Sequence, residues 1–419
     1  MVSSSLHPRY ASLCDGGSDT EVGTIGPVRG ADVVVIGAGV IGLAAAGELR
    51  RAGVDSVVVL EGRGGVGQGS SSRANGGVRA QFSTRPNIEF SRYSLTEFER
   101  MHAESGGELG FHQVGYLLFT GTADGLCGLR AAHDLQRAMG VDTEWLSTDE
   151  VLDRAPFLRP DGLLAGTFHA RDGIVDPHGV VAFLAAQARG YGATVVTDAA
   201  VRSIRSEGRS EGRSGFRISS DAGDFGCEWV VNAAGPDAAS VAAMLSLDLP
   251  IQPVRRNLAY VEGPPAHGPD GGLIPMCVDL DTGVLVRREK SGGYVLAYSN
   301  PDDPPGRETT VDPDFLPQLA GRIGRRFPFL ENVPINPRHC WAGLYPETPD
   351  HHAVLGAPPP LPRFVQCAGF GGHGLMHAPA AGRAVAEIVT SGECSTFDLR
   401  PLRPTRFAEN DLVMESAVF

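Results

Sequence analysis

Short apolar runs alternate with amphipathic stretches along most of the chain, a pattern that predicts strands interleaved with helices in an α/β fold. The clearest unit spans residues 31–61, ADVVVIGAGVIGLAAAGELRRAGVDSVVVLE. Residues 33–36 and 57–60 are continuous apolar runs of the kind found in strands buried on both faces. Between them, the stretch 40–52 predicts a helix that stops at Gly53. The pattern therefore predicts a strand, a crossover helix and a second, parallel strand.

The turn between the first strand and the helix is rich in glycine. Gly37, Gly39 and Gly42 give the spacing G-x-G-x-x-G, and Glu61 follows the second strand. The first glycine allows a tight turn, the second lets a pyrophosphate approach the backbone, and the third lets helix and strand pack closely. The helix start favours that anion, and an acidic residue about twenty positions later meets a ribose hydroxyl. The unit predicts a bound dinucleotide, and on these residues alone NAD and FAD both remain open.

Further elements follow from the same pattern. The helix expected at 86–104 offers Phe90, Tyr93, Phe98 and Met101 as core residues. Other expected elements are a strand at 111–121, a helix at 123–139, a helix and a strand within 176–196, a buried strand that begins at 229, and a helix near 313–327.

Two regions indicate antiparallel pairing. The near-tandem repeat RSEGRSEGRSG, residues 205–215, separates two β-like runs and suggests an enlarged hairpin tip without a role of its own. Residues 250–300 are rich in β-like runs and predict a mostly antiparallel second domain.

A second glycine-rich turn lies near the other end of the chain. Residues 363–393, RFVQCAGFGGHGLMHAPAAGRAVAEIVTSGE, predict a strand, a turn and a helix that stops at Gly392. Two such turns so far apart suggest one discontinuous domain around one extended cofactor. The predicted organisation is a flexible extension at 1–29, a discontinuous Rossmann-like domain at 30–110, 155–247 and 336–400, an α+β substrate domain with a mostly antiparallel sheet at 111–154 and 248–335, and a tail at 401–419.

Composition narrows the function classes. A formal net charge of −13 argues against nucleic acid, whose phosphates require a basic face. No apolar run reaches the roughly twenty residues of a membrane span, and the N-terminal residues lack a secretory h-region. The seven cysteines are dispersed, and His351–His352 have no second cluster at ligand spacing, so we expect reduced thiols, a cytoplasmic protein and no metal. Lys290 is the only lysine and lies in a predicted hairpin turn, which argues against a pyridoxal phosphate enzyme.

The motifs together resemble the D-amino-acid-oxidase-like flavoproteins, in particular the branch of sarcosine oxidase and the FAD-dependent proline or amine dehydrogenases. The resemblance is carried, in order along the chain, by VVVIGAGVIG, SSSRANGGVRAQF, DGIVDP, VVNAAGP, WAGLYPETPDHHAVLG and GFGGHGLMHAPAAG. It implies FAD as the cofactor, with ADP held at the first glycine-rich turn. The Gly369–Gly374 turn and its helix would face the N1–C2=O edge of the flavin, where a helix N-terminus stabilises negative charge.

The resemblance also implies which residues contact FAD. They come from the first turn, the residues after the second strand, the loop that follows, the strand ends at 201 and 234, and the C-terminal turn. The implied residues are Gly37, Gly39, Val40, Ile41, Gly42, Glu61, Gly62, Arg63, Ser70, Ser71, Ser72, Arg73, Asn75, Gly76, Gly77, Val201, Ala234, Gly235, Gly343, Gly369, Gly371, Gly372, His373, Gly374, Leu375 and Met376.

Three residues are candidates for the catalytic site. Arg79 matches the family arginine that pairs with a substrate carboxylate, with a structural ion pair as the alternative. His373 could orient flavin or substrate or be an internally bonded turn histidine, and Tyr345 could face the flavin ring. Asp350 is expected to order its loop, not to act as a base.

The chain departs from the oxidases of that family at three places. Gly343 stands where a cysteine tethers the flavin, so we expect non-covalent FAD, and Cys340, three residues away, is expected to be a buried small hydrophobe. Met376 replaces a carboxylate-binding lysine, and the oxygen-activating lysine would fall near Val295. Efficient use of O₂ is therefore in doubt, and an electron carrier becomes an alternative acceptor.

The predicted function is oxidation of a C–N bond in a secondary amine or amino acid by hydride transfer to flavin N5, giving an imine that water hydrolyses. One alternative is an FAD-dependent dehydrogenase or oxidase of a 2-hydroxy acid, or a tailoring oxidoreductase of a larger metabolite. Another is a flavin-carrying assembly protein. The expected partner is a small-molecule substrate, and homo- or hetero-oligomers are possible.

Overall fold

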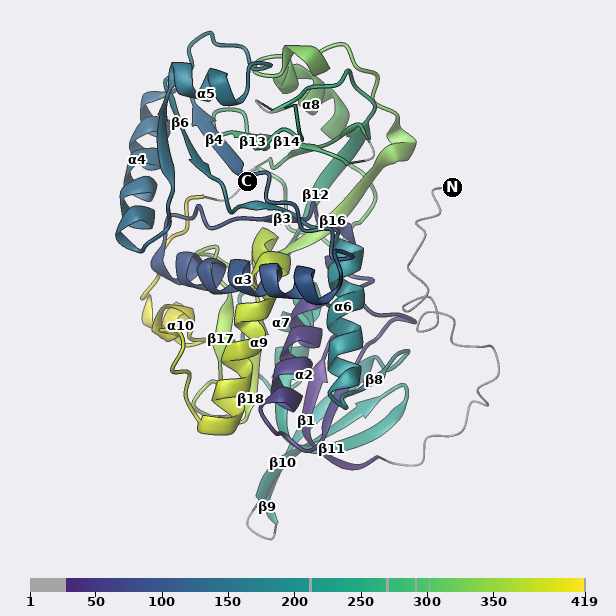
Figure 1. Cartoon of the computed structure of the whole chain (residues 1–419). Coiled ribbons are helices and arrows are strands. Elements are labelled where there is room, and N and C mark those ends of the chain that lie inside the picture. Colours follow the sequence, from purple (N-terminus) through teal and green to yellow (C-terminus); the bar gives the residue numbers. More distant parts are fainter. Residues whose placement is uncertain (1–27, 211–212, 269–270, 291, 301, 418–419) are drawn as a thin grey trace.

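The computed structural model describes residues 28–210, 213–268, 271–290, 292–300 and 302–417. Two large sheets lie one above the other, with helices on the sides of each (Figure 1). Most of the predicted N-terminal extension, residues 1–27, and Cys14 with it, lies outside the described residues. Its last two residues, Val28–Arg29, belong to the first strand instead.

The first sheet has the Rossmann-like arrangement that the sequence predicts. Its strand order is β17-β18-β11-β1-β2-β8, with the β9–β10 hairpin added beside β11. Strands β1, β2, β8, β11 and β18 run parallel, so their carboxyl ends meet at one edge. The strands are β1 (Val28–Ile36), β2 (Val57–Leu60), β8 (Thr194–Val196), β9 (Val201–Ser210), β10 (Arg213–Ser220), β11 (Gly223–Asn232), β17 (Val354–Gly356) and β18 (Phe364–Ala368).

The second sheet is mostly antiparallel, as predicted for residues 250–300. Its strand order is β16-β12-β15-β14-β13-β4-β6-β5, and only the β13–β4 pair is parallel. A small separate sheet pairs β3 (Gly77–Val78) with β7 (Gly173–Ile174). The strands of the second sheet are β4 (Tyr116–Thr120), β5 (Glu144–Ser147), β6 (Ala165–His169), β12 (Gln252–Val261), β13 (Met276–Asp279), β14 (Val284–Arg288), β15 (Tyr294–Tyr298) and β16 (Cys340–Glu347).

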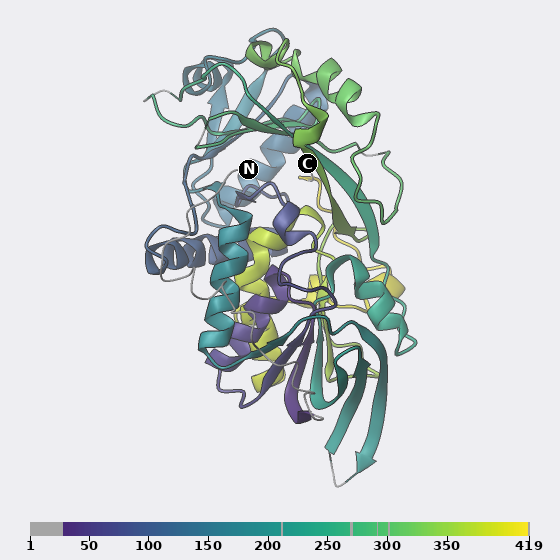
Figure 2. The same cartoon turned by 90° about the vertical axis from the view of Figure 1, so that its right-hand side faces the viewer.

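The helices confirm the predicted positions to within a few residues. Helices α2, α6 and α9 stand against the first sheet, and α3 crosses between the two halves of the molecule (Figures 1 and 2). The helices are α2 (Val40–Arg51), α3 (Arg85–Glu104), α4 (Ala123–Ala138), α5 (Thr148–Arg154), α6 (Pro177–Gly190), α7 (Ala238–Ala243), α8 (Phe315–Ile323), α9 (Gly374–Ser391) and α10 (Arg406–Glu409).

The contact between α2 and α9 brings the two glycine-rich turns together. A Cβ on Gly382 of α9 would lie 2.8 Å from the backbone of Ala44 of α2, so the two helices touch backbone to backbone. β18, which leads into α9, pairs with β11, which in turn pairs with β1. The two helices that follow the glycine-rich turns therefore begin at the same edge of the first sheet.

Apolar burial follows the predicted helix face in α3. Phe90, Phe98 and Met101 are buried in the core beneath the first sheet's helices, and Tyr93 packs against that core from its edge. At about 25 cal/mol per Å² of apolar surface, each such side chain stabilises the fold by roughly 2 kcal/mol.

Three expectations differ from the structure. The repeat 205–215 is not an enlarged tip, because all but residues 211–212, which are not described, continue the strands of the β9–β10 hairpin. The strand expected at 111–121 is confined to β4. The predicted domain division does not follow the sheets in two places. The ranges 155–247 and 336–400, predicted to belong to the Rossmann-like domain, contain β6 and β16, and both strands pair in the second sheet. The division otherwise stays a prediction.

Candidate functional site

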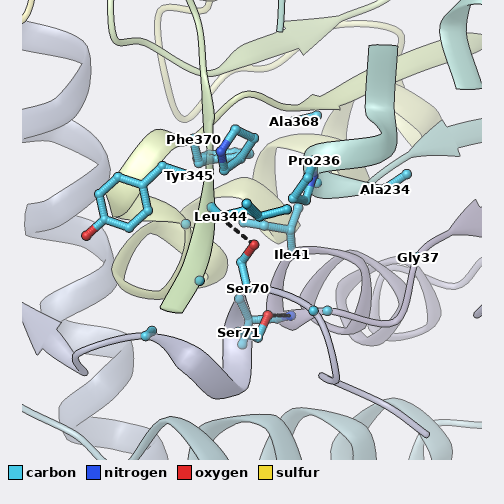
Figure 3. Close-up of a pocket in the computed structure, with 18 of the residues that line it drawn as sticks. Gly37, Ile41, Ser70, Ser71, Ala234, Pro236, Leu344, Tyr345, Ala368 and Phe370 are labelled. Atoms are coloured by element: carbon cyan, nitrogen blue, oxygen red, sulfur yellow. Dashed lines mark hydrogen bonds between the residues drawn. The ribbon is translucent and has the colours of Figure 1, made fainter. Parts of the chain in front are cut away.

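One long cavity of about 720 Å³ lies between the carboxyl edge of the first sheet and the second sheet. Its floor is made of glycine-rich turns and its roof of strands from the second sheet. In Figure 3, Ser70 and Ser71 rise from one wall, and Leu344, Tyr345 and Phe370 face them. This volume is in the range of cavities that hold cofactors and drug-sized ligands, about 300–1,000 Å³.

The first glycine-rich turn has no room for side chains. Gly37 has a φ of +104°, and a Cβ there would lie 2.5 Å from the carbonyl oxygen of Ala233 on the turn after β11. A Cβ on Gly42 would lie 1.9 Å from the oxygen of Gly37. Gly37 and Gly39 line the cavity, whereas Gly42 serves the packing of α2 against the turn.

Glu61 closes this end of the cavity. Its Oε2 accepts from the backbone N–H of Ala38 at 2.8 Å, and its Oε1 accepts from that of Arg63 at 3.0 Å. The carboxylate is thereby fixed at the end of β2, next to the glycine-rich turn. This is the position that the spacing predicts for a ribose contact.

The loop after β2 is bonded to both neighbouring walls. Ser70 Oγ donates to the Leu344 carbonyl at 2.6 Å (Figure 3), and Ser71 Oγ accepts from the N–H of Val40 at the start of α2. Arg73 Nη1 donates to the Ala342 carbonyl at 2.9 Å. These bonds tie the loop to α2 and to β16, so it cannot move independently of either wall.

The second glycine-rich turn follows β18 and lines the cavity as far as Tyr345, which lies at the end away from Gly37 (Figure 3). Gly369 and Gly371 have φ angles of +76° and +50°, which favour glycine. A Cβ on Gly372 would lie 2.5 Å from the ring of Tyr345, so this glycine makes room for the tyrosine. Burial raises the pKa of Tyr345, whose phenol therefore stays protonated at neutral pH.

His373 lies between this turn and Arg79. Its ring packs edge-on against Phe82, with the ring centroids 4.7 Å apart. Burial lowers its pKa well below the ordinary value, and the positive charge of Arg79 lowers it further. A neutral imidazole is therefore expected throughout the physiological pH range.

Arg79 is buried at this end, with 3% of its surface exposed. Its Nη1 donates to the Gln81 carbonyl, its Nη2 donates to the Ala417 carbonyl at 2.5 Å, and its Cζ lies 3.9 Å from the centre of the Phe82 ring. Burial lowers the pKa of Arg79, and nearby acidic groups such as Glu415 oppose that shift. An arginine stays protonated in spite of such a shift, so the site holds a buried positive charge.

Five further residues of the second sheet line the cavity, and no sequence pattern pointed to them. Tyr116 is the most informative, because a Cβ on Gly77 would lie 1.7 Å from its hydroxyl, which fixes the phenol against the loop backbone. Burial raises its pKa. These residues are Tyr116, Arg256, Leu258, Met276 and Leu285.

The residues at the three departures lie as follows. Gly343 lines the cavity and faces Arg73. A Cβ added at position 343 would lie 3.2 Å from the Cβ of Arg73. Cys340 does not line the cavity, and it is only partly buried, contrary to the expectation of a buried residue. Met376 lines the cavity, but Val295 does not, and Met276 and Leu285 form that part of the wall.

All other predicted site residues line the same cavity except Gly42 and Ser72. Asp350 is buried in an ion pair with Arg406, at 2.7 Å, which agrees with its expected ordering role.

Among the described residues, no group of three or more histidine, cysteine or acidic side chains is placed to hold a metal ion. No helix in the described part of the chain has the length and apolar character needed to cross a membrane.

Comparisons with known proteins agree on one family. The sequence model of the DAO family, FAD dependent oxidoreductases, matches residues 32–388. FAD-dependent oxidoreductase domain-containing protein 1 of Bos taurus is 28% identical, over 94% of this chain and 88% of its own length. The structure of L-proline dehydrogenase from P. horikoshii has a TM-score of 0.84 at 27% identity, covering 91% of this chain and 99% of that one. Glycine oxidase from Geobacillus kaustophilus has a TM-score of 0.78 at 26% identity, covering 90% of this chain and 99% of that one.

Proposed function

The chain belongs to the DAO family of FAD-dependent oxidoreductases, and from this premise we propose that it oxidises the C–N bond of an amino acid or of a secondary amine that carries a carboxylate. The similar structures include a proline dehydrogenase and a glycine oxidase, whose names describe substrates of this kind. The imine formed would then be hydrolysed by water.

The cavity fits FAD. At one end, the glycine-rich turn lets a pyrophosphate approach the backbone, and Glu61 stands where a ribose hydroxyl would meet it. In the loop, Asn75 Oδ1 is buried without a hydrogen-bond partner in the described part of the chain, and it lies on the cavity wall. FAD carries hydroxyl and N–H donors that such an acceptor requires. When bound, FAD supplies the two-electron acceptor that takes a hydride at N5.

The observation that carries the proposal is the buried, protonated Arg79 at the end of the cavity away from Glu61. A guanidinium in a site of low dielectric favours a carboxylate strongly over neutral groups. Holding the carboxylate would orient the neighbouring carbon–nitrogen bond, and such positioning is a large part of catalysis in this chemistry. Tyr116 and Tyr345 add two protonated phenols to the same end.

The proposed reaction does not require an acid–base pair of side chains in the site. His373 lies within reach of the charge of Arg79, and burial keeps its imidazole neutral. The substrate amine must give its proton to solvent before the hydride leaves, and a neutral imidazole can then accept a hydrogen bond from the N–H of the uncharged amine. We assign His373 this orienting role.

We further propose that the acceptor that reoxidises the flavin is an electron carrier and that O₂ reacts slowly. No lysine lines the cavity, and Lys290 stands in an exposed turn. Three apolar side chains, Met276 and Leu285 of the second sheet and Met376 of α9, line the cavity without a charge.

Anaerobic reduction of the purified yellow protein tests the function. Amino acids and N-alkyl amino acids should bleach the flavin absorbance, and the matched amines without a carboxylate should not. Bleaching by 2-hydroxy acids alone would replace the proposal with hydroxy-acid oxidation. If neither the amino acids nor the 2-hydroxy acids reduce the flavin, the alternative of a flavin-carrying assembly protein is favoured. Rapid release of hydrogen peroxide in air would contradict the electron-carrier proposal.

A further inference from the structure

The segment Asp411–Ala417 returns from α10 to the junction of the two halves of the molecule (Figure 1). It forms no helix or strand, and most of its side chains are exposed, such as that of Met414 at 57%. Glu415 is the exception, with 3% of its surface exposed. A buried carboxylate in an otherwise exposed segment must be stabilised by specific partners.

Glu415 is bonded to the first turn of α3. Its Oε1 accepts from the N–H and the hydroxyl of Ser83, and its Oε2 accepts from Thr84 Oγ1 at 2.7 Å and from Asn87 Nδ2 at 2.9 Å. Burial alone would raise the pKa of Glu415, but these hydrogen bonds and one from the Ala417 N–H lower it below its ordinary value. The carboxylate therefore stays ionised at neutral pH.

A second contact fixes the segment from the other side. The N–H of Glu415 donates to the Asp350 carbonyl at 3.2 Å. The Asp350 carboxylate is in turn paired with Arg406 of α10, where both side chains are fully buried. The path of the chain between α10 and Ala417 is thus set at both ends by buried ionised groups.

Within its described residues, the segment contacts the candidate active site at Arg79. The Ala417 carbonyl accepts from Arg79 Nη2 at 2.5 Å, two residues after Glu415. On its other side, the guanidinium stacks on Phe82, which directly precedes the residues that bind Glu415. Arg79 is thereby held between the C-terminal segment and the chain leading into α3.

We propose that Glu415 is a positioning residue for Arg79, and this inference rests on the proposed role of Arg79 in carboxylate binding. By fixing Asp411–Ala417 on α3, Glu415 keeps the Ala417 carbonyl on Nη2 and sets the plane of the guanidinium. A carboxylate then meets an arginine that is already oriented, and the cost of immobilising it on binding is smaller. The C-terminal segment is on this account a part of the substrate site.

Glu415→Gln tests the inference with a minimal change in volume. The amide can still accept from Ser83, but its NH₂ group would face the amide donor of Asn87 or the hydroxyl of Thr84. Glu387→Gln is the matched control. Glu387 is also a buried carboxylate that holds a passing segment, through Ser395 and Thr396, but it lies thirteen residues along α9 from Gly374, about 20 Å away.

The measurement uses the FAD-loaded protein and acetate as the probe, with acetamide as the uncharged comparison at equal ionic strength. Acetate binding is followed by the change it causes in the flavin absorbance spectrum, and the affinity for FAD and the Tm are recorded alongside. We expect Glu415→Gln to weaken acetate binding about tenfold, equivalent to about 1.4 kcal/mol, without a comparable change in FAD affinity. Ser83→Ala, which removes one hydroxyl partner, should shift acetate binding in the same direction by less.

Equal acetate affinity in wild type and Glu415→Gln would overturn the inference, as would an equal loss in Glu387→Gln. Absence of any acetate effect in the wild type would overturn it as well. The proposed function is judged separately, because acetate binding requires no turnover. If amino acids reduce the flavin of both proteins equally well, the positioning role fails and the function stands. If acetate binding depends on Glu415 and no amino acid reduces the flavin, the positioning role stands and the proposed function fails.

Discussion

The two ends of the cavity are built in different ways. The cofactor end consists of backbone, with Gly37 and Gly39 at its surface and one acidic side chain, Glu61, bonded to the turn itself. The proposed substrate end consists of side chains, with Arg79 beside Tyr345 and Tyr116 of the second sheet. A site built from backbone recognises a group that many cofactors share, such as a pyrophosphate. A site built from side chains selects among ligands that differ in charge and shape.

The difference extends to how each end is held together. The residues of the cofactor end belong to continuous segments that run from a strand through a turn into a helix. Arg79 depends on contacts with Phe82 and with Ala417, which is far away in the sequence. Substitutions at the two ends should therefore separate flavin binding from substrate binding.

The largest effect is expected at the cofactor end. Gly42→Ala would place a Cβ 1.9 Å from the Gly37 oxygen, so the turn must shift and flavin affinity should fall by at least about 100-fold. Gly47→Ala in the same helix is the control, because the nearest atom would be 3.5 Å away and alanine favours the helix. The ratio of flavin to protein absorbance after gel filtration measures the effect. Retention of full flavin by Gly42→Ala would show that the turn does not determine affinity.

The next effect is confined to the substrate end. Arg79→Lys keeps a positive charge but loses the two-pronged pairing with a carboxylate, so kcat/KM for a carboxylate substrate should fall about 100-fold, or roughly 2–3 kcal/mol. The flavin content should stay at the wild-type value. Steady-state kinetics with an artificial electron acceptor measure this, and an unchanged kcat/KM would exclude Arg79 from substrate binding.

A smaller effect is expected for Tyr116→Phe. The change removes only the hydroxyl that lies against Gly77. A hydrogen bond to substrate would be lost while the packing stays, so KM should rise about fivefold, which corresponds to the net strength of one hydrogen bond. Tyr191→Phe, at an exposed position, should leave KM unchanged. A fall in flavin content without a change in KM would place Tyr116 in cofactor binding instead.

The smallest effect per residue concerns pH. Burial lowers the pKa values of His352, His373 and His377 near the substrate end. As the pH falls through the ordinary histidine pKa of about 6.5, the unfolded chain takes up protons that the folded protein does not, so stability decreases by up to about 1.4 kcal/mol per pH unit for each histidine. The Tm should therefore decline below about pH 7.

Thermal unfolding between pH 5 and 8 checks this. His377→Gln should make the decline shallower, whereas a substitution of the exposed His178 should not alter it. A Tm that is independent of pH over this range would contradict the assignment of buried neutral histidines.

The same contrast explains what the sequence could and could not predict. The strand–turn–helix unit at 31–61 and the second turn at 363–393 were predictable, because each is a local pattern in which glycine spacing reports backbone geometry. Tyr116 and Met276 could not be identified, because a strand pattern shows that a residue alternates inward but not which cavity it faces. Glu415 could not be identified either, since a single acidic residue in the C-terminal tail forms no periodic pattern, and its partners Ser83 and Asn87 lie more than three hundred positions away.

The error at residues 205–215 has a related cause. The repeat separates two β-like runs and so suggests a hairpin tip, yet cross-strand pairing extends as far as Ser210 and Arg213. Val295 does not line the cavity, whereas Met276 and Leu285 do, and the expected place of the oxygen-activating lysine near Val295 stays a prediction.

A crystal structure of the FAD-loaded protein with acetate or an N-methyl amino acid bound tests the central claim most directly. The account predicts the ADP moiety at Glu61 and the first glycine-rich turn, and the carboxylate within about 3.2 Å of the Arg79 guanidinium. A carboxylate bound elsewhere, for example at Arg256 and away from Arg79, would contradict the division of the cavity into these two ends.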